Sequence, residues 1–188
     1  VYIRPENDPK KIGDLILHEG SKMGMLLSAS PGFRGRRIEA GLLSAGRDFT
    51  NDRNPFSVGL GKFIDFNKGD FIGRDILINS KKECLTWGMR VENSFAKVDS
   101  YILLNDKKIG IVTSSTWSPY QQCGVSIVHM NNTNFGPGTV VDAFCDDGQI
   151  NKGEICKLPM YDINGDIPRG IKEDIPKGPL PWKGIAKN

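Results

Sequence analysis

Two charged residues stand near the start of the stretch RRIEAGLLSAGRDF, which runs from Arg36 to Phe49. Arg37 and Glu39 could hold an anionic or polar ligand if this end of the stretch faces a cleft. The same pair could instead be structural at a helix N-terminus, where a carboxylate also favours the helix dipole. The residue types alone leave both interpretations open.

Hydroxyl and aromatic residues come together in a second stretch, GIVTSSTWSPY, from Gly110 to Tyr120. The pattern predicts a strand followed by a loop. Trp117, Ser118 and Tyr120 could overhang a pocket, with the aromatic rings stacked on a flat ligand. Alternatively, the hydroxyl groups serve only to satisfy the backbone of an ordinary turn. The two interpretations are equally compatible with the residues.

The cysteines and histidines show no spacing typical of a metal site or a nucleophilic triad. The cysteines are far apart, without a Cys-x-x-Cys pair, and the two histidines stand alone: Cys84, Cys123, Cys145, Cys156, His18 and His129. We therefore expect no metal and no Cys–His or Ser–His–Asp catalysis. Four scattered cysteines also suit a reducing cytoplasm, where we expect the protein to be located.

The composition argues against nucleic-acid and membrane partners. The chain of 188 residues carries 25 Lys and Arg against 22 Asp and Glu, a net charge of only +3, and no run of basic residues forms a stripe. Its apolar stretches are only a few residues long, too short for a membrane-spanning helix. Acidic and basic residues interrupt the first ten positions, which argues against a signal peptide.

The first eighty residues favour helices joined by loops. Proline and periodic apolar residues predict a helix from Pro9 to about Gly20. SASPGFRG, residues 28–35, has the composition of a loop. A second helix is expected from about Arg36 to Ala45, with Gly46 as its C-terminal stop.

Two further elements are expected between residues 50 and 80. After a turn at Asn54, the stretch SVGLGKFIDF, residues 57–66, predicts a glycine-broken strand. FIGRDILINS, residues 71–80, predicts a short helix. VYIRPE at the start of the chain has the composition of the end of a strand without an upstream partner, and we expect that the chain is the C-terminal part of a longer protein.

After Ser80 the pattern changes to alternating apolar and polar residues. Candidate strands occupy 85–91, 101–104, 109–114, 124–130, 139–144 and 154–158. Short strands separated by turn signals predict a small antiparallel barrel or sandwich. From Asp162 the chain is rich in proline, glycine and charge, which predicts an extended or disordered tail in which Trp182 could be fixed by packing.

The motifs in this order resemble the aminomethyltransferase family. They are RRIEAGLLSAGRDF, then NPFSVGLGKFIDFNKGDFIGRD, then GIVTSSTWSP and GPGTVVDAF, and the resemblance covers almost all of residues 1–158. The family includes the T-protein of glycine cleavage, the folate domains of dimethylglycine and sarcosine dehydrogenases, and dimethylsulfoniopropionate demethylase.

The resemblance implies an α+β fold in which the end of a folate-binding domain is followed by a six-stranded antiparallel β-barrel. The expected division is residues 1–80 for the folate-binding domain, 81–160 for the barrel and 161–188 for the tail. It implies tetrahydrofolate as the cofactor and a small-molecule one-carbon donor as a partner. The catalytic aspartate and a folate-holding glutamate of the family would lie in an N-terminal part missing from this chain, so no catalytic residue can be assigned here.

The resemblance also strengthens a folate- or substrate-binding role for Arg37 and Glu39, and it suggests the same for Trp117, Ser118 and Tyr120. The protein would be a tetrahydrofolate-dependent aminomethyl- or methyltransferase, inactive as this portion alone. The alternative is a non-catalytic folate-binding or scaffold member of the same fold.

Departures from the family pattern bear on the donor. Phe33 stands where the glycine-cleavage protein has a substrate-side arginine, with Arg34 one residue out of register, and Ala45 replaces a frequent tyrosine. These changes argue against a lipoyl-bound substrate and favour the branch of the demethylase and the dimethylglycine dehydrogenase. Asp70 occupies the position of a cysteine found in the iron–sulfur maintenance branch, which disfavours that branch.

Overall fold

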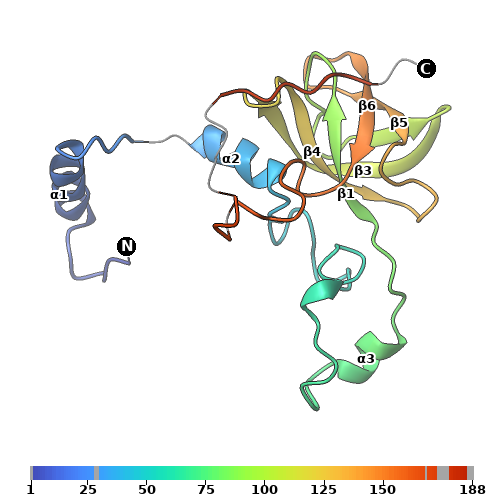
Figure 1. Cartoon of the computed structure of the whole chain (residues 1–188), viewed down its shortest axis with the longest axis horizontal. Helices are drawn as coiled ribbons and strands as arrows, with labels where there is room; N and C mark the ends of the chain where they lie inside the picture. Colours follow the sequence, from blue (N-terminus) through green and yellow to red (C-terminus); the bar gives the residue numbers. More distant parts are fainter. Residues whose placement is uncertain (1, 28–29, 168, 173–177, 186–188) are drawn as a thin grey trace. The chain divides into compact units, whose positions relative to one another are not determined.

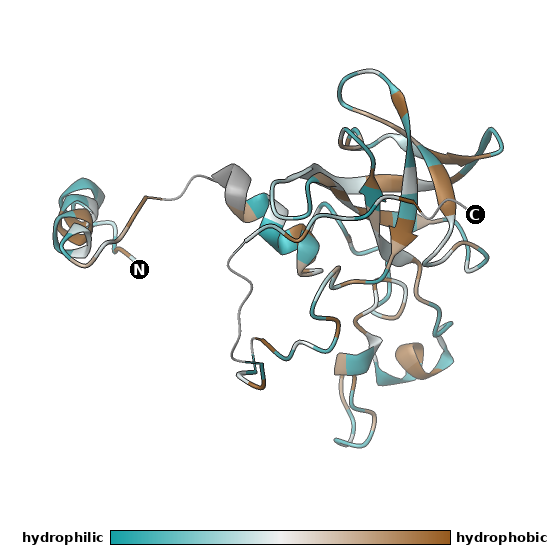
Figure 2. Cartoon of the chain, turned by 45° about the horizontal axis from the view of Figure 1, so that its top comes forward, coloured by the Kyte–Doolittle hydropathy of each residue, from teal (hydrophilic) through white to brown (hydrophobic). Residues whose placement is uncertain are grey.

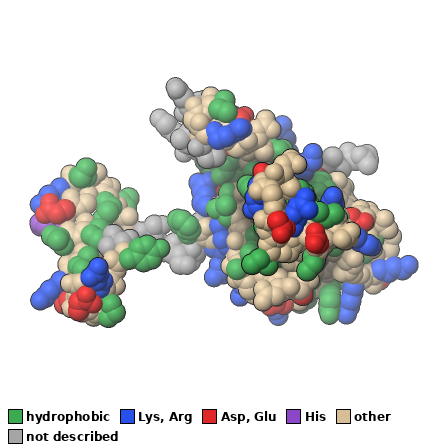
Figure 3. All heavy atoms as spheres, turned by 90° about the horizontal axis from the view of Figure 1, so that it is seen from below, with side chains coloured by type: hydrophobic (Ala, Val, Ile, Leu, Met, Phe, Trp, Pro, Cys, Tyr) green, Lys and Arg blue, Asp and Glu red, His purple; other side chains and the backbone are tan. Residues whose placement is uncertain are grey.

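The computed structural model describes residues 2–27, 30–167, 169–172 and 178–185 of the chain. Contacts divide the chain into two compact units, Val1–Phe33 and Arg34–Asn188. Figure 3 shows positive, negative and hydrophobic side chains interspersed over one face of the molecule. Among the described residues, no helix has both the length and the apolar character needed to cross a membrane.

The first unit contains helix α1, Pro9–Ser21, which confirms the helix expected from Pro9. The Asp8 carboxylate caps it by accepting a 2.9 Å hydrogen bond from the Lys10 backbone. No residue of α1 is buried, and Leu15 remains 61% exposed. The strand expected at the start of the chain is wrong for Tyr2 and Ile3, which have no strand structure; Val1 lies outside the described residues.

The second unit is built on a closed antiparallel barrel, which confirms the expected α+β fold (Figure 1). In the described part of the chain its six strands are β1 (Thr86–Val91), β2 (Tyr101–Leu104), β3 (Lys107–Ser118), β4 (Cys123–Met130), β5 (Val140–Phe144) and β6 (Ile150–Cys156). Their order around the barrel is β1-β4-β3-β2-β5-β6, and β6 closes it by pairing with β1.

The barrel is filled by one set of apolar side chains and covered on one side by another. Alternation along the strands sends residues such as Met89, Val128 and Ile155 inward, where none is exposed. The alternate residues of β4, Val125 and Ile127 among them, face outward into a second cluster. Figure 2 shows both hydrophobic and hydrophilic residues along the strands.

Helix α2, Ser30–Glu39, packs on this outer face through Ile38, which is fully buried. The helix ends earlier than expected. Gly41 adopts a left-handed conformation with φ of +69°, the Leu42 backbone donates to Arg37 O at 2.8 Å, and the Gly41 backbone donates to Ile38 O at 3.0 Å. These two bonds form the capping arrangement that typically ends a helix at glycine.

The expected boundaries of α2 were therefore wrong at both ends. Described residues 30–35 of the predicted loop are helical, and the predicted helix to Ala45 stops at Glu39; residues 28 and 29 lie outside the described residues. The predicted stop at Gly46 is wrong: the helix ends at Gly41, whose left-handed backbone forms the capping arrangement. The chain also passes close to Leu158 there, and a Cβ on Gly41 would lie 2.9 Å from Leu158 Cβ.

Between α2 and β1 the chain runs out from the barrel and returns (Figure 1). The strand expected at 57–66 is wrong: this stretch forms turns and the short 3₁₀ helix η1, Gly61–Phe63. Helix α3, Arg74–Asn79, confirms the helix expected within 71–80. Phe66 lies between Phe56 and Phe71, with ring centroids 6.5 and 6.4 Å away, so aromatic contacts replace sheet pairing here.

Part of the C-terminal segment lies along the turn between β3 and β4. The Leu180 backbone donates to Tyr120 O and the Trp182 backbone donates to Gln121 O, both at 2.8 Å. Trp182 also packs against the cluster that contains Ile38, which confirms its expected packing role. The expected division at residues 80 and 160 remains a prediction.

Candidate functional site

Glu39 and Ser118 meet under the C-terminal end of α2. Glu39 is 1% exposed and Ser118 is fully buried, and the Ser118 hydroxyl donates to the Glu39 carboxylate. The same hydroxyl oxygen accepts a 2.8 Å hydrogen bond from the Gln121 backbone. Arg36 Nη1 lies 3.4 Å from the second carboxylate oxygen of Glu39. Glu39 thus connects α2 to the end of β3.

Tyr120 extends this cluster, and its ring contacts two neighbouring side chains. The Arg36 guanidinium lies 4.7 Å from the Tyr120 ring centroid, and the Tyr161 ring lies 5.2 Å away. Burial raises the pKa of Tyr161, an effect that its hydrogen bond with Arg36 partly offsets. Because Tyr120 is only 9% exposed, its ring has no free face for a ligand in this arrangement.

Arg37 belongs to a different cluster, centred on the buried carboxylate of Asp48. Arg37 Nη1 donates to Asp48 Oδ2 at 2.8 Å, and the Ser44 backbone donates to the same oxygen at 2.8 Å. The hydroxyls of Thr113 and Ser114 both donate to Asp48 Oδ1 at 2.7 Å. Four donors thus satisfy a carboxylate that is fully buried.

An irregularity in β3 makes this arrangement possible. The pairing between β3 and β4 shifts register between Val112 and Ser114. In a regular strand Thr113 and Ser114 would point to opposite faces of the sheet. The extra residue in β3 lets both hydroxyls reach one carboxylate oxygen, as β-bulges commonly redirect side chains.

Trp117 is the most accessible of the predicted site residues. It lies within β3, not in the loop that the sequence predicted, and 39% of its surface is exposed. Its strand partner is Gly124, and Ser94 and Phe95 occupy the space where a Gly124 side chain would lie. The exposed part of the indole offers a surface on which a flat ring could stack.

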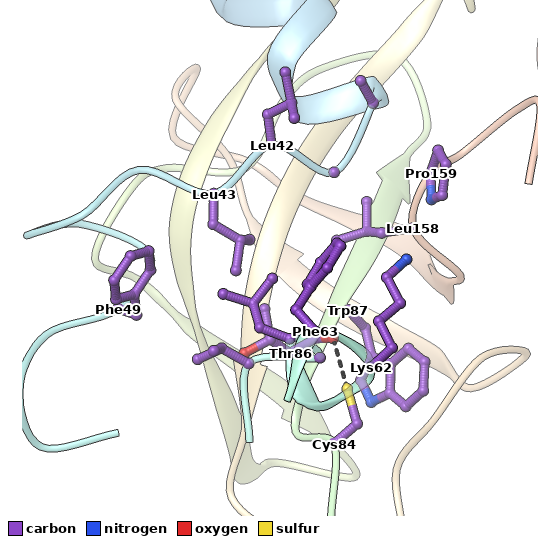
Figure 4. A pocket seen from close by; sticks show the side chains of 15 residues that line it. Leu42, Leu43, Phe49, Lys62, Phe63, Cys84, Thr86, Trp87, Leu158 and Pro159 are labelled. Atoms are coloured by element: carbon purple, nitrogen blue, oxygen red, sulfur yellow. Dashed lines mark hydrogen bonds between the residues drawn. The ribbon is translucent and has the colours of Figure 1, made fainter. Parts of the chain in front are cut away.

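A large apolar pocket lies beside the end of α2, with a volume of about 590 Å³. Figure 4 shows Leu43, Phe63, Trp87 and Leu158 around it, with Cys84 hydrogen-bonded to the Thr86 carbonyl at 3.3 Å. Phe63 at its edge is 73% exposed. The pocket suits an apolar group, and it brings together none of the five predicted site residues.

The buried cysteines and His129 have perturbed pKa values that are typical of structural side chains. Burial raises the pKa of Cys123 to about 12 and that of Cys156 to about 11, so neither thiol is a ready nucleophile at neutral pH. Burial lowers the pKa of His129 to about 4, and its Nδ1 lies 2.9 Å from the Thr86 hydroxyl. Within the described ranges, no group of three His, Cys, Asp or Glu side chains could hold a metal ion.

The five predicted site residues therefore divide into three settings. Glu39, Ser118 and Tyr120 share one buried cluster, Arg37 belongs to the Asp48 cluster, and Trp117 is exposed. Asp48 was not identified from the sequence. The sequence Gly46-Arg47-Asp48 soon after α2 could have drawn attention to this carboxylate. The two hydroxyl groups that bind it, however, meet only because of the bulge in β3, which the sequence pattern does not reveal.

Comparisons with known sequences relate this chain to aminomethyltransferases. No protein-family model matches the chain. The aminomethyltransferase of Halothermothrix orenii is 29% identical over 165 residues, covering 85% of this chain and 45% of that protein. The aminomethyltransferase of Pseudothermotoga lettingae is 32% identical over 130 residues, covering 66% of this chain and 35% of that protein.

A solved structure has the same fold. The glycine cleavage system aminomethyltransferase T from Bartonella henselae superposes with a TM-score of 0.69 at 20% identity, covering 82% of this chain and 44% of that one. The chain spans less than half the length of the curated relatives it matches. In sequence this chain is similar to aminomethyltransferases over most of its length, and it shares its fold with one of known structure.

Proposed function

We propose that this chain is part of a tetrahydrofolate-dependent one-carbon transferase that moves an aminomethyl or methyl group from a small-molecule donor. The observation that carries the proposal is the match to curated aminomethyltransferases over 85% of the chain. The same relatives are more than twice as long as the matched region. We therefore propose that a further segment of the protein supplies the remaining part of the site, including the catalytic carboxylate.

The residues of this chain fit such a ligand through Trp117. Its accessible indole would stack on the flat ring system of the folate, and stacking of this kind holds aromatic ligands without covalent chemistry. Glu39 and Ser118 would act indirectly, because their hydrogen bond holds the end of β3, and hence Trp117, against α2. Bound tetrahydrofolate would supply the nucleophilic nitrogen that accepts the one-carbon unit.

The protein would accelerate the transfer by positioning the donor carbon near that nitrogen and by placing charge around it. Proximity and electrostatic placement together account for large rate enhancements without a covalent enzyme intermediate. This agrees with the cysteines described above, whose raised pKa values disfavour nucleophilic attack.

The test is one-carbon transfer by the intact protein that contains this chain. Tetrahydrofolate is supplied with a methylated glycine and a two-electron acceptor, with a sulfonium methyl donor, or with a lipoyl-bound aminomethyl group, and the folate product is identified by mass. The departures at Phe33 and Ala45 predict product from the methylated glycine or the sulfonium compound. Folate binding without product from any donor would favour the non-catalytic alternative, and the absence of both would exclude the proposal.

A further inference from the structure

A polar pocket of about 240 Å³ lies between the second half of α2, the turn that follows it and the middle of β3. Three arginines line it: Arg34, Arg37 and Arg47. Three hydroxyl residues, Ser44, Ser114 and Ser115, complete the polar lining. The pocket therefore gathers cationic and neutral hydrogen-bond donors, and no carboxylate lines it among the described residues.

The charges of the pocket are not balanced. Asp48 compensates Arg37 through a direct ion pair at 2.8 Å. Within the described part of the chain, neither Arg34 nor Arg47 has a carboxylate partner within 4.0 Å. The guanidinium groups of Arg34 and Arg47 therefore line a concave site beside Asp48, whose carboxylate is already paired with Arg37. A concave site with unbalanced positive charge attracts anions.

The third guanidinium is held in place before any ligand arrives. Arg37 Nη2 donates to the Ser114 hydroxyl at 2.7 Å while Nη1 donates to Asp48 and to the Leu42 carbonyl. Only 20% of the Arg37 side chain is exposed, so these contacts fix its orientation toward the pocket. A fixed guanidinium loses little conformational entropy on binding, which favours affinity for a planar or tetrahedral oxyanion.

We propose that this pocket is a binding site for a small oxyanion, the carboxylate or phosphate group of a small molecule. Arg34 and Arg47 supply the charge, and Arg37, held by Asp48 and Ser114, supplies a fixed donor. The volume of the pocket suits such a group and is too small for a folded partner. The site goes beyond the one-carbon chemistry proposed above and does not depend on it.

The experiment is calorimetric titration of the full chain at low ionic strength with two probes, glutarate and inorganic phosphate. Each probe that represents the natural group should bind saturably, and its affinity should fall with added salt, which screens exposed charges. Arg34→Gln and Arg47→Gln should each weaken binding by about threefold, and the double variant by about tenfold. Lys107→Gln, at the exposed start of β3, removes the same charge elsewhere and should leave affinity unchanged.

Both arginines are exposed, so their replacement should not alter folding, and an unchanged thermal midpoint of the double variant checks this. Stronger binding of glutarate assigns the pocket to a carboxylate, and stronger binding of phosphate assigns it to a phosphate group. The proposal is overturned if neither probe binds the intact chain at millimolar concentration. It is also overturned if the double variant binds like wild type, or if Lys107→Gln weakens binding as much as Arg47→Gln does.

Discussion

Asp48 is the buried charge on which the contact between α2 and the barrel most depends. Its carboxylate joins the helix through Arg37, the following turn through Ser44 and strand β3 through two hydroxyls. Each donor is also desolvated by this contact. Removing the carboxylate therefore leaves a partly buried guanidinium without its counter-charge, which costs more than the pair itself contributes.

We predict that Asp48→Asn lowers the free energy of unfolding by about 3–5 kcal/mol, the usual cost of breaking a buried ion pair. The control is Asp142→Asn, which removes the partner of Lys152 in a far less buried pair on β5 and β6. That substitution should cost less than about 1 kcal/mol. Urea unfolding of both variants measures the difference, and equal costs would show that Asp48 is not a structural centre.

His129 makes stability depend on pH. Burial lowers its pKa to about 4 in the folded protein, against an ordinary value near 6.5. Between these two values the unfolded chain binds a proton that the folded chain does not, so stability falls as pH drops from about 6.5 to about 4. The loss attributable to this residue is at most about 3 kcal/mol.

Replacement of His129 by glutamine should remove that part of the pH dependence. We predict that the variant loses less stability than wild type between pH 7.5 and pH 4.5, because glutamine does not titrate. Urea unfolding at the two pH values measures both losses. An identical loss in the two proteins would contradict the lowered pKa.

At the scale of secondary-structure elements, the end of α2 depends on Gly41. This residue has a left-handed backbone and also lies against Leu158. Gly46 has the same backbone handedness, but a Cβ there would meet only open space, with no atom within 4 Å. Any side chain is strained at both positions. Only at Gly41 would it also displace a packed neighbour.

We predict that Gly41→Ala lowers the unfolding free energy by about 3 kcal/mol, the sum of backbone strain and overpacking. Gly46→Ala should cost only about 1–2 kcal/mol, the strain alone. The difference between the two midpoints in thermal unfolding isolates the contact with Leu158. If Gly46→Ala is the more costly change, Gly41 is not the residue on which the end of the helix depends.

How much the sequence predicts differs between the elements. The barrel strands were predictable because residues such as Met89 and Val91 alternate with polar ones and turn signals separate the strands. The structure of residues 57–66 was not predictable, because aromatic residues are also typical of strands. The ring of Phe66 packs against Phe56 and Phe71, which come from the same segment between α2 and β1. Local patterns report periodicity but not which distant side chain a residue meets.

The same limit applies to the candidate site. Arg37 and Glu39 could be singled out by residue type, but they are two positions apart on α2 and face different partners. Ser118, expected in a loop, ends a strand because the strand continues past the bulge. Asp48 was missed because its role depends on Thr113 and Ser114, more than sixty residues away.

At the scale of the whole molecule, the exposed apolar side chains are the feature that most favours association with a partner. Leu15 on α1, Leu42 beside the apolar pocket and Phe63 at its edge are 61%, 62% and 73% exposed. Exposed apolar area costs roughly 25 cal/mol per Å² relative to burial, so several such side chains together favour association.

We predict that residues 1–188 expressed alone self-associate and show no one-carbon transfer. Light scattering after size exclusion measures the mass. The double variant Leu42→Ser, Phe63→Ser should reduce the association, while Lys107→Gln, an exposed control on the barrel, should leave it unchanged. A monodisperse monomer that turns over folate would contradict both this prediction and the proposal that another segment supplies the catalytic carboxylate.

The most direct test of the proposed function is the binding of tetrahydrofolate to the intact protein that contains this chain, measured by calorimetry. The proposal predicts saturable binding of one folate per protein, weakened by about 1–3 kcal/mol in Trp117→Ala if the indole stacks fully. Trp182→Phe, at a partly buried position packed against the cluster that contains Ile38, should retain the wild-type affinity. Absence of saturable binding to the folded protein would contradict both the transferase and the folate-binding alternative.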